Sequence, residues 1–137
     1  MTTRVAQVFR TATPEDVRSI SPKIESLDSA LRNTDGLVRR DTSSDDWYFS
    51  YFGPARSRFM GVSISCFDRR DHGIEIVISY DPAISHDAPA IAELRSIMAR
   101  VLGENLMGSL IREKRSTPFA ETKRPNPESL DVAEPTS

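Results

Sequence analysis

The stretch RFMGVSISCFDRRDHGIEIVISY, residues 58–80, predicts a β-hairpin and through it the fold of the chain. In both arms, 58–68 and 74–80, apolar residues alternate with polar or small ones, as in strands that bury one face. The loop 69–73 ends in Gly73, which suits the positive φ of a short hairpin loop. The residues expected to share the buried face are Met60, Val62, Ile64, Cys66, Ile74, Ile76, Ile78 and Tyr80.

Upstream of the hairpin, the sequence DDWYFSYFG at 45–53 predicts a strand over 46–52, because aromatic residues favour strands. It holds half of the aromatic residues of the chain. Gly53-Pro54 ends it, and a further short strand is expected over 37–42. Alternation along a strand places Trp47, Phe49 and Tyr51 on one side and Tyr48 and Phe52 on the other.

Helices are expected on both sides of this strand-rich region. Thr13 is a natural N-cap, with Asp16 where an acid completes a capping box, and an apolar stripe at helical spacing follows as far as residue 31. Pro22 interrupts that stripe, so we expect a kink or two consecutive helices. A second apolar stripe predicts a C-terminal helix capped by Asp87 or Ser85 and ending at Arg115, and Gly103 is a point at which this stripe is either interrupted or continued.

These elements define an α+β fold with two layers. A three- to four-stranded antiparallel meander packs against an N-terminal and a C-terminal helix, with a possible first strand around residues 5–9. One face of the sheet lies on the helices and the other is partly solvated. Residues 1–115 form a single domain, and the proline-rich remainder, 116–137, is expected to be disordered.

The composition excludes some classes of function and leaves others open. The net charge of −2 gives no overall field that would attract nucleic acid or an acidic membrane. Cys66 is the single cysteine, so no intrachain disulfide forms. The sequence has no signal-peptide pattern and no apolar run that could span a membrane, which favours a cytoplasmic protein without membrane contact.

The aromatic strand is the strongest candidate for a binding site. A sheet covered on one face only should not be apolar on both, so one set of these rings is available to a partner, and tryptophan and tyrosine are enriched in interface hot spots. Acidic residues precede the strand and arginines follow it. The predicted partner-binding residues are Asp45, Asp46, Trp47, Tyr48, Phe49, Tyr51, Phe52, Arg56 and Arg58.

Catalytic and metal signatures are weak. His72 lies in the hairpin loop and His86 precedes the C-terminal helix, each beside an aspartate, so a small enzyme using either histidine is an alternative. The chain lacks metal-ligand spacing and glycine-rich phosphate loops, and no cofactor or metal is expected. Cys66 alternates with core residues, which favours a small buried side chain over a nucleophile.

The arginine pairs raise a third class of function. Only three of the 18 basic residues are lysines, and paired arginines close to aromatic residues are typical of single-stranded nucleic-acid binders. Neighbouring aspartates and the neutral balance disfavour that class. The sequence therefore favours a small non-catalytic module that binds another protein, such as an adaptor, a secretion chaperone or an immunity-type inhibitor, with a homodimer also possible.

Overall fold

The computed structural model describes residues 3–40, 46–69 and 73–118. They form a six-stranded antiparallel sheet in the order β2-β3-β4-β5-β1-β6. The strands are β1 (Thr3–Arg10), β2 (Val38–Arg39), β3 (Trp47–Phe52), β4 (Val62–Asp68), β5 (Ile74–Tyr80) and β6 (Ile111–Pro118). The helices are α1 (Pro14–Ile20), the 3₁₀ turn η1 (Ser21–Lys23), α2 (Ile24–Arg32), α3 (Pro89–Leu102) and α4 (Glu104–Ser109).

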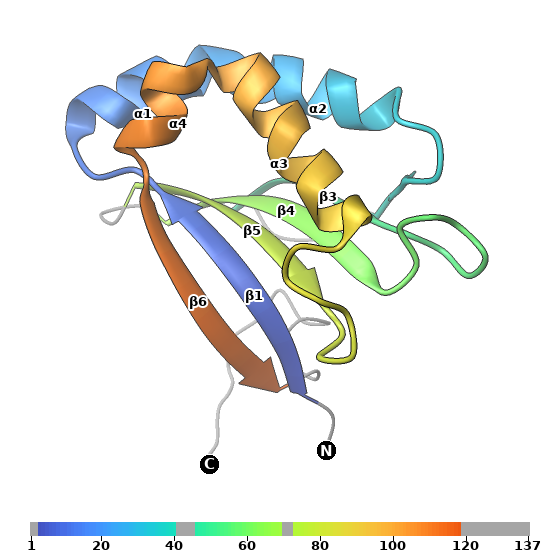
Figure 1. Ribbon diagram of the computed structural model, residues 1–137. Helices are drawn as coiled ribbons and strands as arrows, with labels where there is room; N and C mark the ends of the chain where they lie inside the picture. Colours follow the sequence, from blue (N-terminus) through green and yellow to red (C-terminus); the bar gives the residue numbers. More distant parts are fainter. Residues whose placement is uncertain (1–2, 41–45, 70–72, 119–137) are drawn as a thin grey trace.

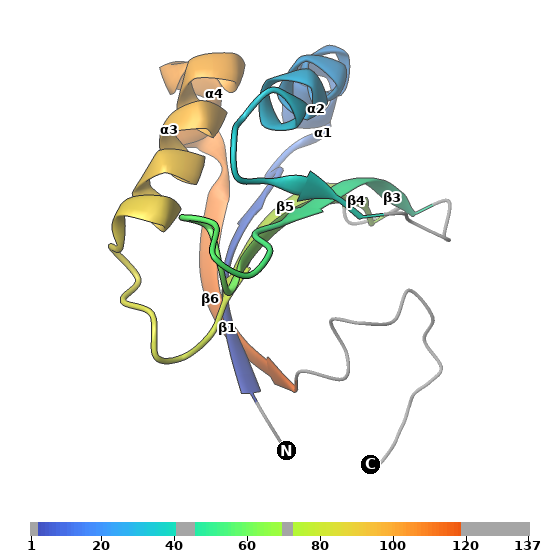
Figure 2. The same ribbon diagram turned by 90° about the vertical axis from the view of Figure 1, so that its right-hand side faces the viewer.

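All of these helices lie on one face of the sheet, as the two views show (Figures 1 and 2). The mixed helix-and-sheet class and the antiparallel sheet predicted from the sequence are confirmed. None of the helices in the described ranges is long and apolar enough to cross a membrane.

The start of α1 follows the predicted capping box. The Thr13 hydroxyl accepts a hydrogen bond from the Asp16 amide, and the Asp16 carboxylate accepts one from the Thr13 amide. These bonds satisfy amide groups that the first helical turn leaves unpaired. Pro22 then stands in η1, and the chain continues as α2. The interrupted stripe therefore forms two consecutive helices, one of the two outcomes expected.

The hydrophobic core lies between the helices and the facing side of the sheet. The strand β5 contributes every second residue, beginning at Ile74, and α2 and α3 contribute residues such as Leu27 and Leu94, all almost fully buried. Full burial of one aliphatic side chain stabilises a fold by about 1.5–3 kcal/mol. The predicted phase of β5, and of β4 from Val62 to Cys66, is confirmed, because the residues expected inside are the buried ones.

The C-terminal helix ends earlier than predicted. Gly103, with a φ of 90°, ends α3, and the chain then forms α4 and the strand β6 in place of one helix up to Arg115. The possible first strand is confirmed as β1. Its presence explains why residues 111–118 form a strand and not the end of a helix. Its edge would stay unpaired without β6, which pairs with it from Thr3–Pro118 to Arg10–Ile111. The last strand also crosses the expected boundary at residue 115.

The first arm of the hairpin is shorter than predicted. Residues 58–61 form a turn, in which Gly61 has a φ of 81°, and β4 begins only at Val62. Met60 is therefore exposed, whereas Phe59, expected on the opposite face, is fully buried in the core. The predicted strand 37–42 is reduced to Val38 and Arg39 within the described residues.

Candidate functional site

The face of the sheet opposite the helices is called the open face here, because no helix in the described ranges lies on it (Figure 2). Three rows of neighbouring residues cross it. They are Trp47–Phe67–Glu75–Arg10–Ile111, Ser50–Ser65–Val77–Val8–Glu113 and Phe52–Ser63–Ser79–Ala6–Arg115. Small side chains therefore form the middle of the face, with aromatic rings on β3 and β4 and charged groups on β1 and β6.

The aromatic part of the open face combines rings with guanidinium groups. Trp47 and Phe67 pack edge to face, with ring centroids 4.5 Å apart. The guanidinium of Arg69 lies 4.4 Å from the Phe67 centroid. At the other end of β3, Arg40 lies 5.1 Å from the Phe52 centroid. Each end of β3 thus carries a cation on an aromatic ring.

The side on which Trp47 lies differs from the expected alternation. The register between β3 and β4 shifts between Trp47 and Phe49, because an irregularity inserts one residue. Trp47 consequently pairs with Phe67 on the open face, while Phe49 and Tyr51 point into the core and are fully buried. The latter two are unavailable to a partner while the fold is intact. Tyr48, at the irregularity, is 40% exposed.

Tyr51 has a structural contact at the edge of the core. Its hydroxyl donates a hydrogen bond to the carboxylate of Asp28 on α2, which also receives one from Arg39 at 2.7 Å. Burial raises the pKa of Tyr51, and the bond to Asp28 adds to that rise. The cluster ties α2 to β2 and β3, so Tyr51 holds the helical layer on the sheet.

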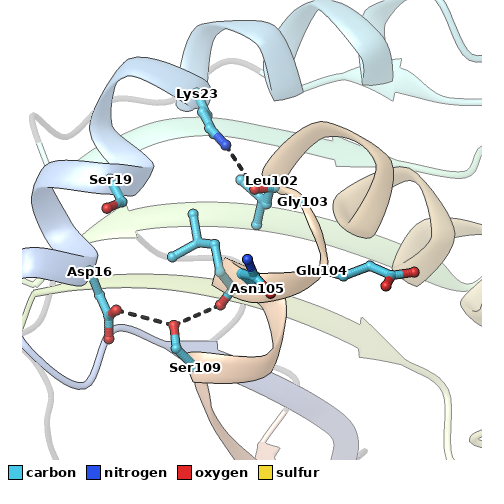
Figure 3. A pocket seen from close by; sticks show the side chains of 9 residues that line it. Asp16, Ser19, Lys23, Leu102, Gly103, Glu104, Asn105 and Ser109 are labelled. Atoms are coloured by element: carbon cyan, nitrogen blue, oxygen red, sulfur yellow. Dashed lines mark hydrogen bonds between the residues drawn. The ribbon is translucent and has the colours of Figure 1, made fainter.

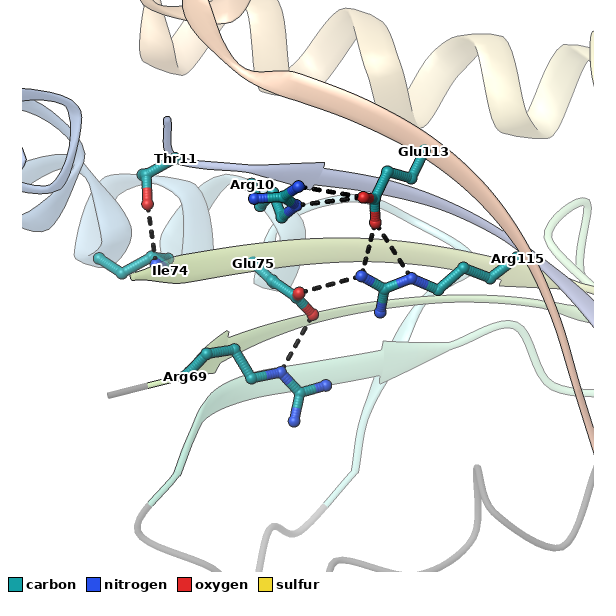
Figure 4. Close-up of polar contacts among 7 residues, drawn as sticks. All are labelled: Arg10, Thr11, Arg69, Ile74, Glu75, Glu113 and Arg115. Carbon is teal, nitrogen blue, oxygen red and sulfur yellow. Dashed lines mark hydrogen bonds and ion pairs between the residues drawn. The ribbon is translucent and has the colours of Figure 1, made fainter. Parts of the chain in front are cut away.

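Ion pairs join the other strands of the open face (Figure 4). Glu75 is only 5% exposed and accepts hydrogen bonds from Arg69 at 3.0 Å and Arg115 at 3.3 Å. Glu113 binds Arg115 at 2.6 Å and Arg10 at 3.1 Å. The bonds to Arg115 and to Arg10 lower the pKa of Glu113. The resulting ionic chain connects β5, β1 and β6 with Arg69, the residue that follows β4.

Two further arginines stand at the opposite end of the open face. Arg4 donates hydrogen bonds to the Ser79 hydroxyl at 2.8 Å and the Gly61 carbonyl at 3.0 Å. Burial lowers the pKa of Arg4; Asp81 acts in the opposite sense, and the nearby charge of Arg40 adds to the lowering. Burial also lowers the pKa of Arg40. The two guanidinium groups are thus close enough to repel each other in partly desolvated positions.

The remaining predicted partner-binding residues lie outside the open face or outside the described ranges. Asp45 belongs to the undescribed residues, and Asp46 accepts a hydrogen bond from the Asp68 amide through its backbone carbonyl. Arg56 is exposed, with a φ of 71°. Arg58 binds Glu93 at 2.8 Å and therefore connects the turn before β4 to α3.

The groups considered for catalysis are not assembled in the described structure. The side chain of His86 is exposed, and the neighbouring Asp87 carboxylate accepts its hydrogen bond from Ser85. The bond from Ser85 lowers the pKa of Asp87. Cys66 is fully buried, which raises the pKa of its thiol and leaves it without the accessible thiolate that a nucleophile needs. His72 lies outside the described residues.

A shallow depression lies between α1 and the turn from α3 to α4 (Figure 3). Lys23 donates a hydrogen bond to the Leu102 carbonyl at 2.9 Å, and Ser109 donates to Asp16 at 3.1 Å. These polar groups already bind the two helical segments to each other. The depression therefore supports the contact between helices, and its lining offers no assembled ligand set.

Within the described ranges, no cluster of three or more histidine, cysteine, aspartate or glutamate side chains could hold a metal ion. No family model matches the chain, and no curated protein sequence or solved structure shows significant similarity to it. A functional interpretation therefore rests on the geometry of the open face.

Several features of that face were missed by the sequence reasoning. The sequence pattern places Phe67 in the hairpin but does not predict its packing on Trp47. The ionic chain through Glu75 was also missed, because Arg115 was expected in a helix. The alternation of β5 was the available signal: it placed Glu75 on the side away from the core, where a carboxylate requires water or a cation.

Proposed function

We propose that the protein is a small cytoplasmic protein-binding module whose open face receives a partner. The observation that carries this proposal is the set of three rings on the sheet face opposite the helices: the contacting pair Trp47 and Phe67, and Phe52 at the other end of β3. All three rings are partly exposed. Aromatic side chains close to arginines are the composition of interface hot spots. Adaptors, secretion chaperones and immunity-type inhibitors are the classes of protein that use such a face.

Further apolar side chains extend the surface beyond the rings. Val38 lies beside Phe52 on β2 and is 44% exposed, and Ile111 ends the row that begins at Trp47. Apolar groups at both edges of a sheet face give a partner more area than one isolated ring would. The serines in the middle of the face are almost fully buried, so the polar contacts with a partner come from the charged groups around the rings.

A small enzyme remains the alternative, through His86 or through His72. The observation that counts against the His86 version is the hydrogen bond from Ser85 to Asp87, since it engages the carboxylate that would have to orient the imidazole. A catalytic base needs an orienting partner within hydrogen-bond reach.

Site-specific photo-crosslinking tests the proposal. A photoreactive phenylalanine analogue placed at Phe52 on the open face should form a discrete adduct in extract of the source organism. The same analogue at Ser26, exposed on α2, should not. Mass spectrometry of the adduct identifies another protein or a second copy of this chain. Adducts of equal yield at both positions, or none at position 52, would contradict binding through the open face.

A further inference from the structure

The charged groups of the open face are unbalanced. Among the described residues, the basic side chains are Arg4, Arg10, Arg40, Arg69 and Arg115, and the acidic side chains are Asp81, Glu75 and Glu113. This face is therefore locally positive, although the whole chain carries a net charge of −2. A locally positive face attracts an acidic partner selectively, because complementary potentials favour the correct orientation on encounter.

Arg40 is the least compensated of these cations. Its guanidinium contacts the Phe52 ring, yet it has neither an ion pair nor a side-chain hydrogen bond within the described structure. It is only partly exposed, and the nearby Arg4 adds a second positive charge. A partly desolvated cation without a counter-charge costs free energy that an incoming carboxylate recovers.

Arg69 is the cation at the other end of β3. Among the described residues, its hydrogen bond goes from Nε to Glu75 (Figure 4), and its two terminal nitrogens bind no other described residue. Its side chain is 42% exposed. Trp47 and Phe52 are five residues apart on β3, a distance of about 16 Å at about 3.3 Å per residue. Arg69 and Arg40, each seated on a ring near one of these ends, are thus separated by the length of a short extended peptide.

The covered rings favour a peptide over single-stranded nucleic acid. A base-stacking platform needs ring faces that are free. Here guanidinium groups lie over Phe52 and Phe67, and the edge-to-face contact with Phe67 engages Trp47.

We propose that the open face binds an extended acidic segment of its partner, with carboxylates on Arg40 and Arg69 and an apolar side chain on Trp47. This inference rests on the proposed function and specifies the partner's chemistry. Between the two cations, Ser50 and Ser65 are almost fully buried and their hydroxyls bond each other at 2.8 Å, so the contacts with the peptide come from the partly exposed arginines and rings. Binding weakens as the ionic strength rises, because the decisive contacts are charged and partly exposed.

Peptide selection followed by titration tests this inference. Short random peptides displayed on phage are selected on the immobilised full-length protein, and the enriched sequences are synthesised and titrated by fluorescence anisotropy. Acidic peptides with one apolar or aromatic residue should be enriched. Arg40→Gln and Arg69→Gln should each weaken their binding by about tenfold or more, because each removes a charge-assisted contact. Arg100→Gln, on the exposed surface of α3, is the matched control and should leave binding unchanged.

The outcomes separate this inference from the proposed function. Neutral apolar peptides that depend on Trp47 but not on Arg40 would overturn the acidic specificity and keep protein binding. Oligouridine that binds more tightly than any selected peptide, and depends on Arg40, would favour nucleic acid and overturn both. No enriched peptide, or peptides indifferent to all these substitutions, would also count against both. Thermal melts verify that each variant is folded, and Arg40→Gln removes no ion pair or side-chain hydrogen bond of the described structure.

Discussion

The two faces of β5 show how one strand serves two purposes. Ile76 and Ile78 on one side are completely buried beneath the helices, whereas Val77 on the other side is partly exposed. Glu75, also on that second side, is covered by arginine side chains that themselves remain in contact with water. Burial therefore holds the helix-covered face together, while ion pairs organise the open face. Apolar burial and ion pairing are thus divided between the two sides of a single sheet.

Substitution of Ile76 by aspartate tests the helix-covered face of β5, where the side chains are most deeply buried. A charge in the middle of the core costs more than about 4 kcal/mol, which approaches the whole stability of a small domain. We expect Ile76→Asp to be unfolded by circular dichroism. Val77→Asp, one residue away on the open face, should retain a cooperative melt. Unfolding of both variants would show that the open face is as tightly closed as the core.

Substitution of Glu75 by glutamine tests whether the ionic chain stabilises the open face. The neutral amide no longer pairs with Arg69 and Arg115, but both guanidinium groups are partly exposed and can be hydrated. We therefore expect a loss of about 1 kcal/mol in urea denaturation, below the cost of breaking a fully buried ion pair. Glu113→Gln, with a more exposed carboxylate, should lose less. A larger loss for Glu113→Gln would reverse this ranking of the two sites.

The smallest effect concerns Asp16, away from the open face. The bond from the Ala12 amide, followed by that from Ser109, lowers the pKa of Asp16. Its contribution to stability is therefore present above the unfolded value of about 3.9 and is lost as the pH falls through the folded pKa. Between about pH 5 and pH 2, Asp16→Asn should lose less thermal stability than the wild type. If the melting temperatures of the two proteins fall by the same amount across that pH range, the role of the carboxylate is contradicted.

Much of the fold could be predicted because local patterns were strong. The Thr13–Asp16 capping box and the period-two alternation of β5 each depend on neighbouring residues, and both hold in the structure. The strand β6 could not be predicted in this way. Its sequence, IREKRSTP, is charged and ends in proline, and it becomes a strand because β1 offers an unpaired edge more than a hundred residues earlier in the chain.

The candidate site was predictable in part for the same reason. The aromatic content of β3 indicated a binding surface, but the irregularity at Trp47 reversed the expected side of that residue. A single inserted residue leaves no reliable mark on the sequence pattern, since alternation on each side of it looks normal. Likewise, the cation on Phe67 comes from Arg69, beyond the end of β4, so only the turned backbone brings the two together.

The position of β1 between β5 and β6 governs the order in which the sheet is completed. This strand, residues 3–10, lies far along the chain from its two neighbours, residues 74–80 and 111–118. The β4–β5 hairpin, by contrast, joins segments that follow each other directly. Pairing of distant strands costs more loop-closure entropy than pairing of adjacent ones, so we expect the hairpin to form before β1 pairs with β5 and β6. On this expectation, the first described strand in the chain is among the last to pair with both of its neighbours.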